Sequence, residues 1–201
     1  ERSGASAVYG FTEAVIGANW RRPQGPGSSI SGLDDHPVVQ LNWYAAQAYC
    51  QWAGGQLPSE AQWEKAARGS DGRLFPWGND LPKGVFLNAA DVNLQVPWAK
   101  KDQNDGFKYT SPVGSYPAGA SPYGVLDLSG NAWEWTRSLY RDYPYKMDDG
   151  RELRSDPREA DLVTIRGGCW YDDYGSVRAT LRYGGKADQS TDGTGFRCVL
   201  P

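Results

Sequence analysis

Two segments in the first third of the chain carry the spacing of apolar residues that predicts helices. The first begins after Asn42, a good N-cap, and runs from Trp43 to Ala53, where two glycines end it. Apolar residues at positions i, i+3, i+4 and i+7 predict a single buried stripe, made of Ala45, Ala48, Tyr49 and Trp52. We therefore expect this helix to pack through that stripe.

The second predicted helix follows Pro58. Ser59 and Gln62 have the spacing of a capping box, in which each side chain bonds the backbone of the other, and Gly69 is the expected end. Its inward-facing residues are expected to be Trp63, Ala66 and Ala67. No later segment repeats this pattern.

Beyond residue 70, glycine and proline interrupt the chain so often that only short strands and turns are expected. Residues 132–136, 163–166 and 195–200 are predicted to be strands, the last closing a sheet, and residues 141–161 an exposed excursion. The sequence shows no repeat, low-complexity tract or linker. We predict one α+β domain over residues 1–201, with two helices and many loops.

Composition removes several classes of function. The 21 basic and 24 acidic residues give a net charge of −3, which argues against a general nucleic-acid binder. No stretch approaches the ~18 apolar residues of a membrane span, and no apolar signal-peptide core follows Glu1. One histidine excludes multi-histidine metal sites, and three cysteines exclude a four-thiolate zinc site.

The histidine and the cysteines have ordinary structural interpretations. His36 stands alone and is expected to be a hydrogen-bonded structural residue. Cys50 and Cys198 could pair and close a long loop, or could be two buried free thiols, and the sequence leaves both open. Cys169 lacks a neighbouring base and is expected to be a small buried residue.

Oxygen-bearing side chains crowd two loops. One contains Asn88, Asp91, Asn93, Asp102, Asn104 and Asp105, and the other contains Asp127, Asn131 and Glu134 around Gly130. Such loops suit calcium, which takes about 6–8 oxygen ligands in flexible geometry, although neither has EF-hand spacing. A merely solvated acidic loop is the plainer interpretation.

A third region follows Arg166-Gly167-Gly168. It is rich in Tyr, Asp, Gly, Ser and Thr between Tyr171 and Gly193, with Arg178 and Arg182 as candidate ion-pair residues. Tyrosine supplies rigid contact area and small polar residues supply hydrogen bonds, as on adaptable binding surfaces. From composition alone, a binding surface and an ordinary polar loop are equally good interpretations of this region.

A set of specific motifs runs from about residue 17 to the end of the chain. They are Gly17-Ala18-Asn19-Trp20-Arg21, Gly25-Pro26, Asp35-His36-Pro37-Val38-Val39, Ala48-Tyr49-Cys50, Leu57-Pro58-Ser59-Glu60-Ala61-Gln62-Trp63-Glu64, Ala66-Ala67-Arg68-Gly69, Pro76-Trp77-Gly78, Asp127-Leu128-Ser129-Gly130-Asn131-Ala132-Trp133-Glu134-Trp135, Arg166-Gly167-Gly168 and Gly195-Phe196-Arg197-Cys198. Together these motifs resemble the formylglycine-generating-enzyme (sulfatase-modifying-factor) family. The resemblance implies a C-type-lectin-like fold. It also implies that an N-terminal stretch with a strand hairpin, usual in the family, is missing before Glu1.

The resemblance further implies structural calcium. One site would use Asn88, the carbonyl of Ala89, Asp105 and the carbonyl of Phe107. A second would use Asp127, the carbonyls of Gly130 and Ala132, and Glu134. Cys50 and Cys198 match positions that form a disulfide in some members.

Catalysis does not carry over from the family. The enzymes resembled here use two cysteines that bind copper and act on a substrate cysteine, but Asp172 stands where the first should be and the second is absent. Cys169 occupies a serine position. Aspartate cannot replace a soft thiolate for copper(I), and the iron-dependent branch of the superfamily needs more than one histidine.

We therefore expect a non-catalytic domain that binds a protein or other macromolecule, and not nucleic acid or a membrane interior. The tail resembles the variable region of proteins diversified by diversity-generating retroelements. The candidate ligand-binding residues, expected to be exposed, are Tyr171, Asp172, Asp173, Tyr174, Gly175, Ser176, Tyr183, Gly184, Gly185, Thr191 and Asp192. The alternatives are an enzyme using Asp172, Asp173 and Arg178, or a regulatory domain of a longer chain. The ligand, the compartment and the oligomeric state stay open.

Overall fold

The structure is a computed structural model that describes residues 15–153 and 156–200. Its elements in chain order are α1 (Trp43–Trp52), α2 (Glu60–Arg68), a short 3-10 helix (Pro117–Gly119), β1 (Trp133–Leu139), β2 (Leu162–Arg166), β3 (Arg182–Lys186) and β4 (Thr194–Phe196). The predicted α+β class, with two helices, short strands and long loops, is confirmed. The expectations about Glu1 and a missing N-terminal hairpin lie outside the described residues.

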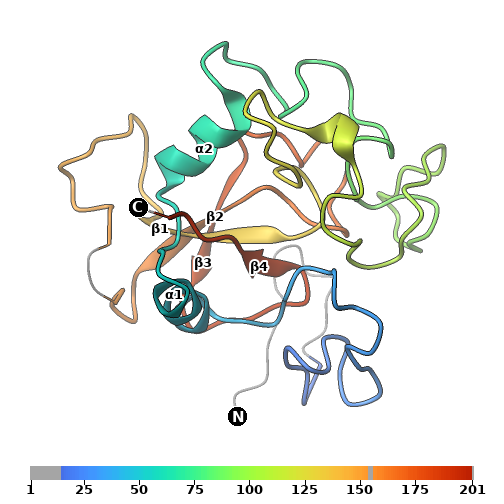
Figure 1. Cartoon of the computed structure of the whole chain (residues 1–201), viewed down its shortest axis with the longest axis horizontal. Coiled ribbons are helices and arrows are strands. Elements are labelled where there is room, and N and C mark those ends of the chain that lie inside the picture. The colour runs from blue at the N-terminus through green and yellow to red at the C-terminus, as the bar shows by residue number, and fades with distance from the viewer. Residues whose placement is uncertain (1–14, 154–155, 201) are drawn as a thin grey trace.

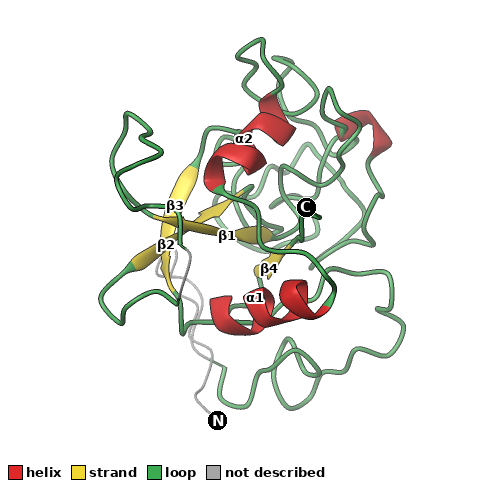
Figure 2. Ribbon diagram, turned by 60° about the vertical axis from the view of Figure 1, so that its left-hand side comes forward, coloured by secondary structure: helices red, strands yellow, loops and turns green. Residues whose placement is uncertain are grey.

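The four strands form one sheet in the order β3-β2-β1-β4. β1 and β2 are antiparallel, as are β2 and β3, whereas β4 runs parallel to β1 at the edge. α2 packs against β1 and β2, and α1 packs against β1. Figure 1 shows the loops between α2 and β1, coloured green to yellow, along the top and right of the molecule, with α1 at the lower left. Figure 2 shows how little of the chain is regular.

Helix α1 begins as predicted but faces the other way. The Asn42 side chain accepts a hydrogen bond from the N–H of Ala45 at 3.0 Å, which confirms the cap. The predicted inward stripe is wrong: Ala45 and Ala48 are exposed, as are Tyr49 and Trp52, the latter by 80%. The buried residues of the helix are Trp43, Ala46 and Cys50. Because the helix carries no charged residue, its apolar spacing could not separate the two faces.

Helix α2 matches its prediction closely. Ser59 and Gln62 form the reciprocal capping box, with hydrogen bonds of 2.8 and 3.1 Å. Trp63 and Ala67 are buried, Ala66 is half-buried, and Gly69 ends the helix at φ 62°. The two helices are joined by a short connection in which Leu57 is fully buried.

Three of the four strands overlap the predicted ones. The terminal strand is shorter than expected, since β4 covers only Thr194–Phe196 of the region near 195–200. Strand β3 was not predicted because Gly184 and Gly185 weaken any strand pattern. Both glycines have a packing reason: a Cβ on Gly184 would lie 3.0 Å from the Tyr140 ring, and one on Gly185 would lie 2.8 Å from the Trp135 ring.

A disulfide anchors α1 to the end of the chain. Cys50 and Cys198, which the sequence left as either a pair or two free thiols, are bonded. Cys50 lies in the main core, with buried aromatic residues such as Trp43, Trp133 and Trp135. The indole N–H of Trp43 donates to the Thr136 carbonyl at 2.8 Å, so this helix is also tied to β1.

The predicted excursion at residues 141–161 is mostly exposed where the structure describes it, but Arg151 and Pro157 are buried. Arg151 is only 1% exposed and forms an ion pair with Asp149 at 2.7 Å. Its guanidinium also lies 4.5 Å from the Tyr145 ring centre. These contacts order the excursion internally, and the N–H of Leu139 in β1, which donates to the Arg151 carbonyl at 2.7 Å, ties it to the sheet.

A buried ionic cluster joins α2 to β2 and β3. Glu60 and Arg166 are both fully buried, 3.4 Å apart, and Arg182 donates to Glu60 at 2.7 Å. Arg166 also donates to Glu64 at 2.6 Å, and its guanidinium lies 5.2 Å from the ring centre of Trp63. Two carboxylates of α2 thus compensate two guanidinium groups from different strands, and Glu60 is shared by both.

Replacing Glu60 with glutamine should destabilise the protein by about 3–5 kcal/mol, because Arg182 loses the carboxylate that it pairs with and buried Arg166 keeps only Glu64. The measurement is the free energy of urea unfolding. Glu159→Gln, at an exposed position, is the matched control and should change it by less than about 0.5 kcal/mol. Equal effects of the two substitutions would contradict the role given to Glu60.

Candidate functional site

The loop after β2 buries the only free thiol of the chain. Cys169 is fully buried, its N–H donates to the Asp172 carboxylate at 2.9 Å, and its Sγ lies 3.4 Å from the same oxygen. Burial raises the pKa of the Cys169 thiol well above its ordinary range, and the Asp172 charge adds to the effect. A thiol held in its protonated form is a poor nucleophile and a poor metal ligand.

The expectation that the following residues form an exposed surface is wrong for four of them. Tyr171 is 8% exposed, Asp172 2%, Tyr174 6% and Thr191 8%. Their burial follows from the fold: Tyr171 packs in the main core, and Tyr174 in a smaller cluster with Phe75 and Leu87. The alternating polar and aromatic composition resembled a surface, but the aromatic rings face inward.

The other candidate residues of this region do not form one continuous site. Asp173 accepts hydrogen bonds from the Gly175 N–H at 2.7 Å and the Ser176 hydroxyl at 2.6 Å, so its carboxylate holds its own turn. Tyr183, with Gly184 and Gly185, lies half-buried in β3, and Asp192 is half-buried. The structure also separates the residues of the enzyme alternative, since Asp172 is buried and Arg178 is exposed.

Most of the first predicted oxygen cluster is brought together, whereas Asp102 is exposed and pairs with Lys100 at 3.2 Å. The two Asp105 oxygens accept the N–H groups of Ala89 at 3.0 Å and Phe107 at 2.8 Å, and Asp91 accepts the N–H of Asp105. Burial raises the pKa of Asp105 to about 7, with Asp91 adding to it. The Oδ1 atom of Asn88 is buried without a hydrogen-bond partner. These residues therefore fit a hard cation, which takes carboxylate, amide and carbonyl oxygens.

In the second oxygen cluster, the guanidinium of Arg197 already compensates the charge of the Glu134 carboxylate. Both oxygens of Glu134 accept hydrogen bonds from Arg197 at 2.6 Å, and one also accepts the indole N–H of Trp63. Asp127 accepts the N–H of Gly114 at 2.7 Å, and burial raises its pKa. The carbonyl of Gly130 accepts the N–H of Ala132 at 2.8 Å. The donor set suits calcium, but the guanidinium already supplies positive charge here.

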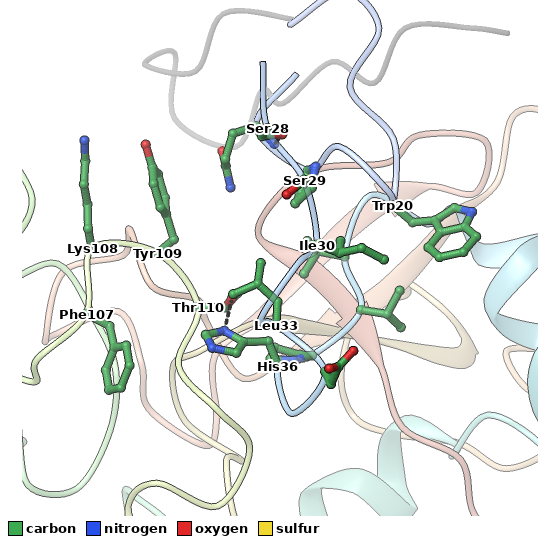
Figure 3. A pocket seen from close by; sticks show the side chains of 16 residues that line it. Trp20, Ser28, Ser29, Ile30, Leu33, His36, Phe107, Lys108, Tyr109 and Thr110 are labelled. Atoms are coloured by element: carbon green, nitrogen blue, oxygen red, sulfur yellow. Dashed lines mark hydrogen bonds between the residues drawn. The ribbon is translucent and has the colours of Figure 1, made fainter. Parts of the chain in front are cut away.

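Between residues 20–39 and residues 107–110 lies a groove of about 560 Å³, which no sequence pattern predicted. Figure 3 shows Phe107, Lys108 and Tyr109 along one wall and Trp20, Ile30 and Leu33 along the other. Four large side chains facing the groove are 38–40% exposed: Trp20, Ile30, Val38 and Tyr109. We use "the groove" for this cavity below.

A few polar groups cross the apolar lining. The His36 ring nitrogen Nδ1 lies 3.0 Å from the Thr110 hydroxyl and joins the two walls, as the dashed line in Figure 3 shows. Burial lowers the pKa of His36, so the ring is neutral at pH 7. Lys108 is exposed at the rim. A mostly apolar cavity of ~300–1,000 Å³ with few polar groups is typical of binding sites.

Sequence reasoning missed the groove because its walls are about 70 residues apart in the chain. The apolar pair Val38-Val39 after His36 was the only available signal, and it indicates a core residue equally well. Tyr109 also links the groove to the buried thiol region, since its ring lies 5.1 Å from Trp170, whose ring lies 4.9 Å from Tyr171.

Comparison of the sequence with known proteins gives one consistent result. The family model described as the sulfatase-modifying factor enzyme 1-like domain matches residues 4–201. The inactive C-alpha-formylglycine-generating enzyme 2 of Bos taurus is 39% identical over 190 residues, covering 90% of this chain and 56% of the relative. The formylglycine-generating enzyme of Bos taurus is 38% identical over 190 residues, covering 92% and 49%. The chain spans about half the length of these curated relatives.

Among solved structures, variable protein 1 of Treponema denticola superposes with a TM-score of 0.60. It is 18% identical and covers 90% of this chain and 76% of its own, which shows the fold alone. The predicted C-type-lectin-like fold of the formylglycine-generating type is thereby confirmed. Within the described part of the chain, no helix is long and apolar enough to span a membrane.

Asp172→Asn should change how stability depends on pH. Burial raises the pKa of Asp172 from an ordinary 3.8 to about 6, so the folded protein holds this proton more tightly than the unfolded chain. The stability that the protonated group contributes is full below pH 4 and is lost as pH rises through 6. A shift of about two units corresponds to roughly 3 kcal/mol.

The measurement is the free energy of unfolding of both proteins between pH 4 and 7.5. The stability of Asp172→Asn relative to wild type should rise by roughly 3 kcal/mol across that range. The comparison at pH 4, where both side chains are neutral, is the internal control. Two parallel curves would refute the pKa assigned to Asp172.

Proposed function

The chain belongs to the sulfatase-modifying factor enzyme 1-like domain family, and we propose that it is a non-catalytic, ligand-binding member. The observation that carries the first half is the thiol inventory. Of the three cysteines, Cys50 and Cys198 form a disulfide, and Cys169 is buried beside Asp172. A copper site built from two thiolates therefore lacks its ligands. The chain is 39% identical to a relative named inactive and 38% identical to one named formylglycine-generating enzyme, so the thiol inventory and not the identity decides between the two.

The ligand-binding half rests on the groove. Four side chains of the groove expose apolar area: Trp20, Ile30, Val38 and Tyr109. Burying this area against a ligand would stabilise the complex by about 25 cal/mol per Å². Lys108 at the rim favours an anionic group on that ligand. We propose that a protein or other macromolecule inserts an apolar side chain or ring here.

The narrower hypothesis of a retroelement-diversified protein has less support than the groove. It needs displayed side chains, and Tyr171, Asp172, Tyr174 and Thr191 are buried. The fold likeness to variable protein 1 is compatible with it but rests on 18% identity. We therefore assign the ligand to the groove.

The alternative is an enzyme or regulatory domain of the same superfamily with a changed active site. An enzyme that used Asp172, Asp173 and Arg178 together would need them to converge, whereas the first is buried, the second holds its own turn and the third is exposed. The described residues give no separate support for a regulatory role. The binding function is the better supported of the two.

We also propose calcium at the first oxygen cluster, and weaker calcium binding at the second. Asn88, Asp105 and the carbonyls of Ala89 and Phe107 would hold the first ion, which would compensate the buried carboxylates. Asp127, Glu134 and the carbonyls of Gly130 and Ala132 would hold the second. There Arg197 competes for the Glu134 oxygens, which lowers the expected affinity.

The groove can be tested with the apolar, anionic dye 8-anilinonaphthalene-1-sulfonate. We expect saturable binding that Ile30→Asp weakens about tenfold or more, because the change removes apolar contact and adds a repelling charge. Tyr109→Ala should weaken it similarly. Trp52→Ala, at an 80% exposed ring outside the groove, is the matched control and should bind as wild type.

Circular dichroism of each variant confirms folding before the dye titration. If Trp52→Ala abolished dye binding and Ile30→Asp did not, the ligand-binding surface would lie on α1 and the assignment to the groove would fail.

The absence of catalysis can be tested with copper(I) and a cysteine-containing peptide. We expect the peptide thiol to keep its mass after aerobic incubation, and the protein to lose copper(I) to a competing chelator. Mass spectrometry reads both results. Conversion of the peptide thiol to an aldehyde would overturn the non-catalytic proposal.

Calcium should raise the melting temperature. At about 100 times its dissociation constant, a bound ion stabilises by about 2.7 kcal/mol, or roughly 5–10 °C for a chain of this size. Asp105→Asn should remove most of the shift and Asp127→Asn a smaller part, while the exposed Asp80→Asn should keep it. An unchanged melting temperature in calcium and in chelator would show that neither cluster binds.

A further inference from the structure

The wall of the groove that carries Phe107, Lys108 and Tyr109 is also part of the first oxygen cluster. Phe107 contributes its ring to the groove and its carbonyl to the proposed calcium ligands. Its N–H donates to Asp105 at 2.8 Å. One short segment of chain therefore belongs to both sites, with its side chains facing the groove in Figure 3.

Asn88 bridges the two sites through one side chain. Its Nδ2 donates to the carbonyl of Tyr109 at 2.7 Å, behind a ring that lines the groove. Its Oδ1 is buried without any partner, although the residue is only 1% exposed. A buried amide with one half bonded and the other half unsatisfied costs free energy unless a donor or a cation meets the free oxygen. The carboxylate of Asp105, which accepts the N–H of the next residue Ala89 at 3.0 Å, favours a cation there.

The far end of the same segment is held independently. The side chain of Asn131 accepts the N–H of Ser111 at 2.9 Å and donates to its carbonyl at 3.2 Å. The N–H of Asn131 in turn donates to the carbonyl of Asn88 at 2.9 Å. Hydrogen bonds from the side chains of two asparagines therefore hold the groove wall, Asn88 at Tyr109 and Asn131 at Ser111. Of these two side chains, that of Asn88 has an oxygen without a hydrogen-bond partner.

We infer that Asn88 is a positioning residue that couples calcium at the first oxygen cluster to the groove, so that calcium binding orders the wall and raises ligand affinity. The coupling rests on the proposed binding function of the groove, but the ordering of the wall does not. With calcium on Oδ1, the side-chain amide is fixed and its Nδ2 holds the Tyr109 carbonyl in place. Without calcium, the amide can leave that carbonyl and residues 107–110 lose one of their supports.

The test is hydrogen–deuterium exchange of the full chain, measured by mass spectrometry without any groove ligand. In wild type, calcium should slow exchange in peptides covering residues 107–111 by about fivefold or more, the lower bound of typical coupling energies. Peptides from α1 should not change, since that helix lies outside the cluster. Calcium titration calorimetry on the same samples establishes that the ion is bound.

Two variants separate calcium binding from the effect of bound calcium on the groove wall. Asn88→Asp keeps an oxygen for calcium and loses the Nδ2 donor, so it should bind calcium at least as well as wild type while exchange at 107–111 no longer slows. Asn88→Ala should lose both effects. Asn79→Asp makes the same substitution at an exposed position outside both oxygen clusters and is the matched control, which should keep the coupling.

Slowed exchange in wild type and Asn79→Asp, but not in Asn88→Asp, supports the inference. Calcium binding with unchanged exchange in wild type overturns it without any variant, as does full slowing in Asn88→Asp. Absence of calcium binding overturns it as well. Dye binding to the calcium-free protein is measured separately, so failure of the groove as a binding site is distinguished from failure of the coupling.

Discussion

Buried charge is the constraint on which the arrangement of this protein depends. Glu60 and Arg166 are fully buried, and their energy is acceptable only while each has its partner at close range. Glu60 comes from the first turn of α2, whereas Arg166 and Arg182 come from neighbouring strands. The helix therefore has little freedom to slide or rotate on the sheet. Arg166 is also the last residue of β2, so the loop that buries Cys169 leaves the sheet from a fixed point.

The sequence correctly predicted those features of the fold that depend on residues only a few positions apart. Asn42 and the pair Ser59 and Gln62 marked both helix starts correctly, because capping bonds join residues only a few positions apart. The facing of α1 could not be read in the same way. That face is chosen by the Cys50 disulfide and by the Trp43 bond to Thr136, and both partners are far away in the chain.

The functional regions show the same limit more strongly. Ligand types at Asn88 and Asp105 were recognisable because oxygen donors are identified by residue type alone. The exposure of Tyr171 and Tyr174 was misjudged because an aromatic ring among polar neighbours suits a surface and a loop-rich interior equally well. The groove could not be predicted at all, since Ile30 and Tyr109 become neighbours only when the loops fold together. The sequence identified which kinds of side chain are present, and the fold determines which of them a ligand can reach.

The Cys50–Cys198 bond has a mechanical consequence. It closes a ring over 148 positions of sequence that contains α2 and every strand of the sheet. A pulling force applied before Cys50 and after Cys198 would pass along the sulfur–sulfur bond and bypass that ring. The sheet, the groove wall at residues 107–110 and the buried thiol would carry almost none of the tension. The opposite wall of the groove, at residues 20–39, lies before Cys50 and would carry the force, so pulling on this chain would load one wall of its binding region and spare the other.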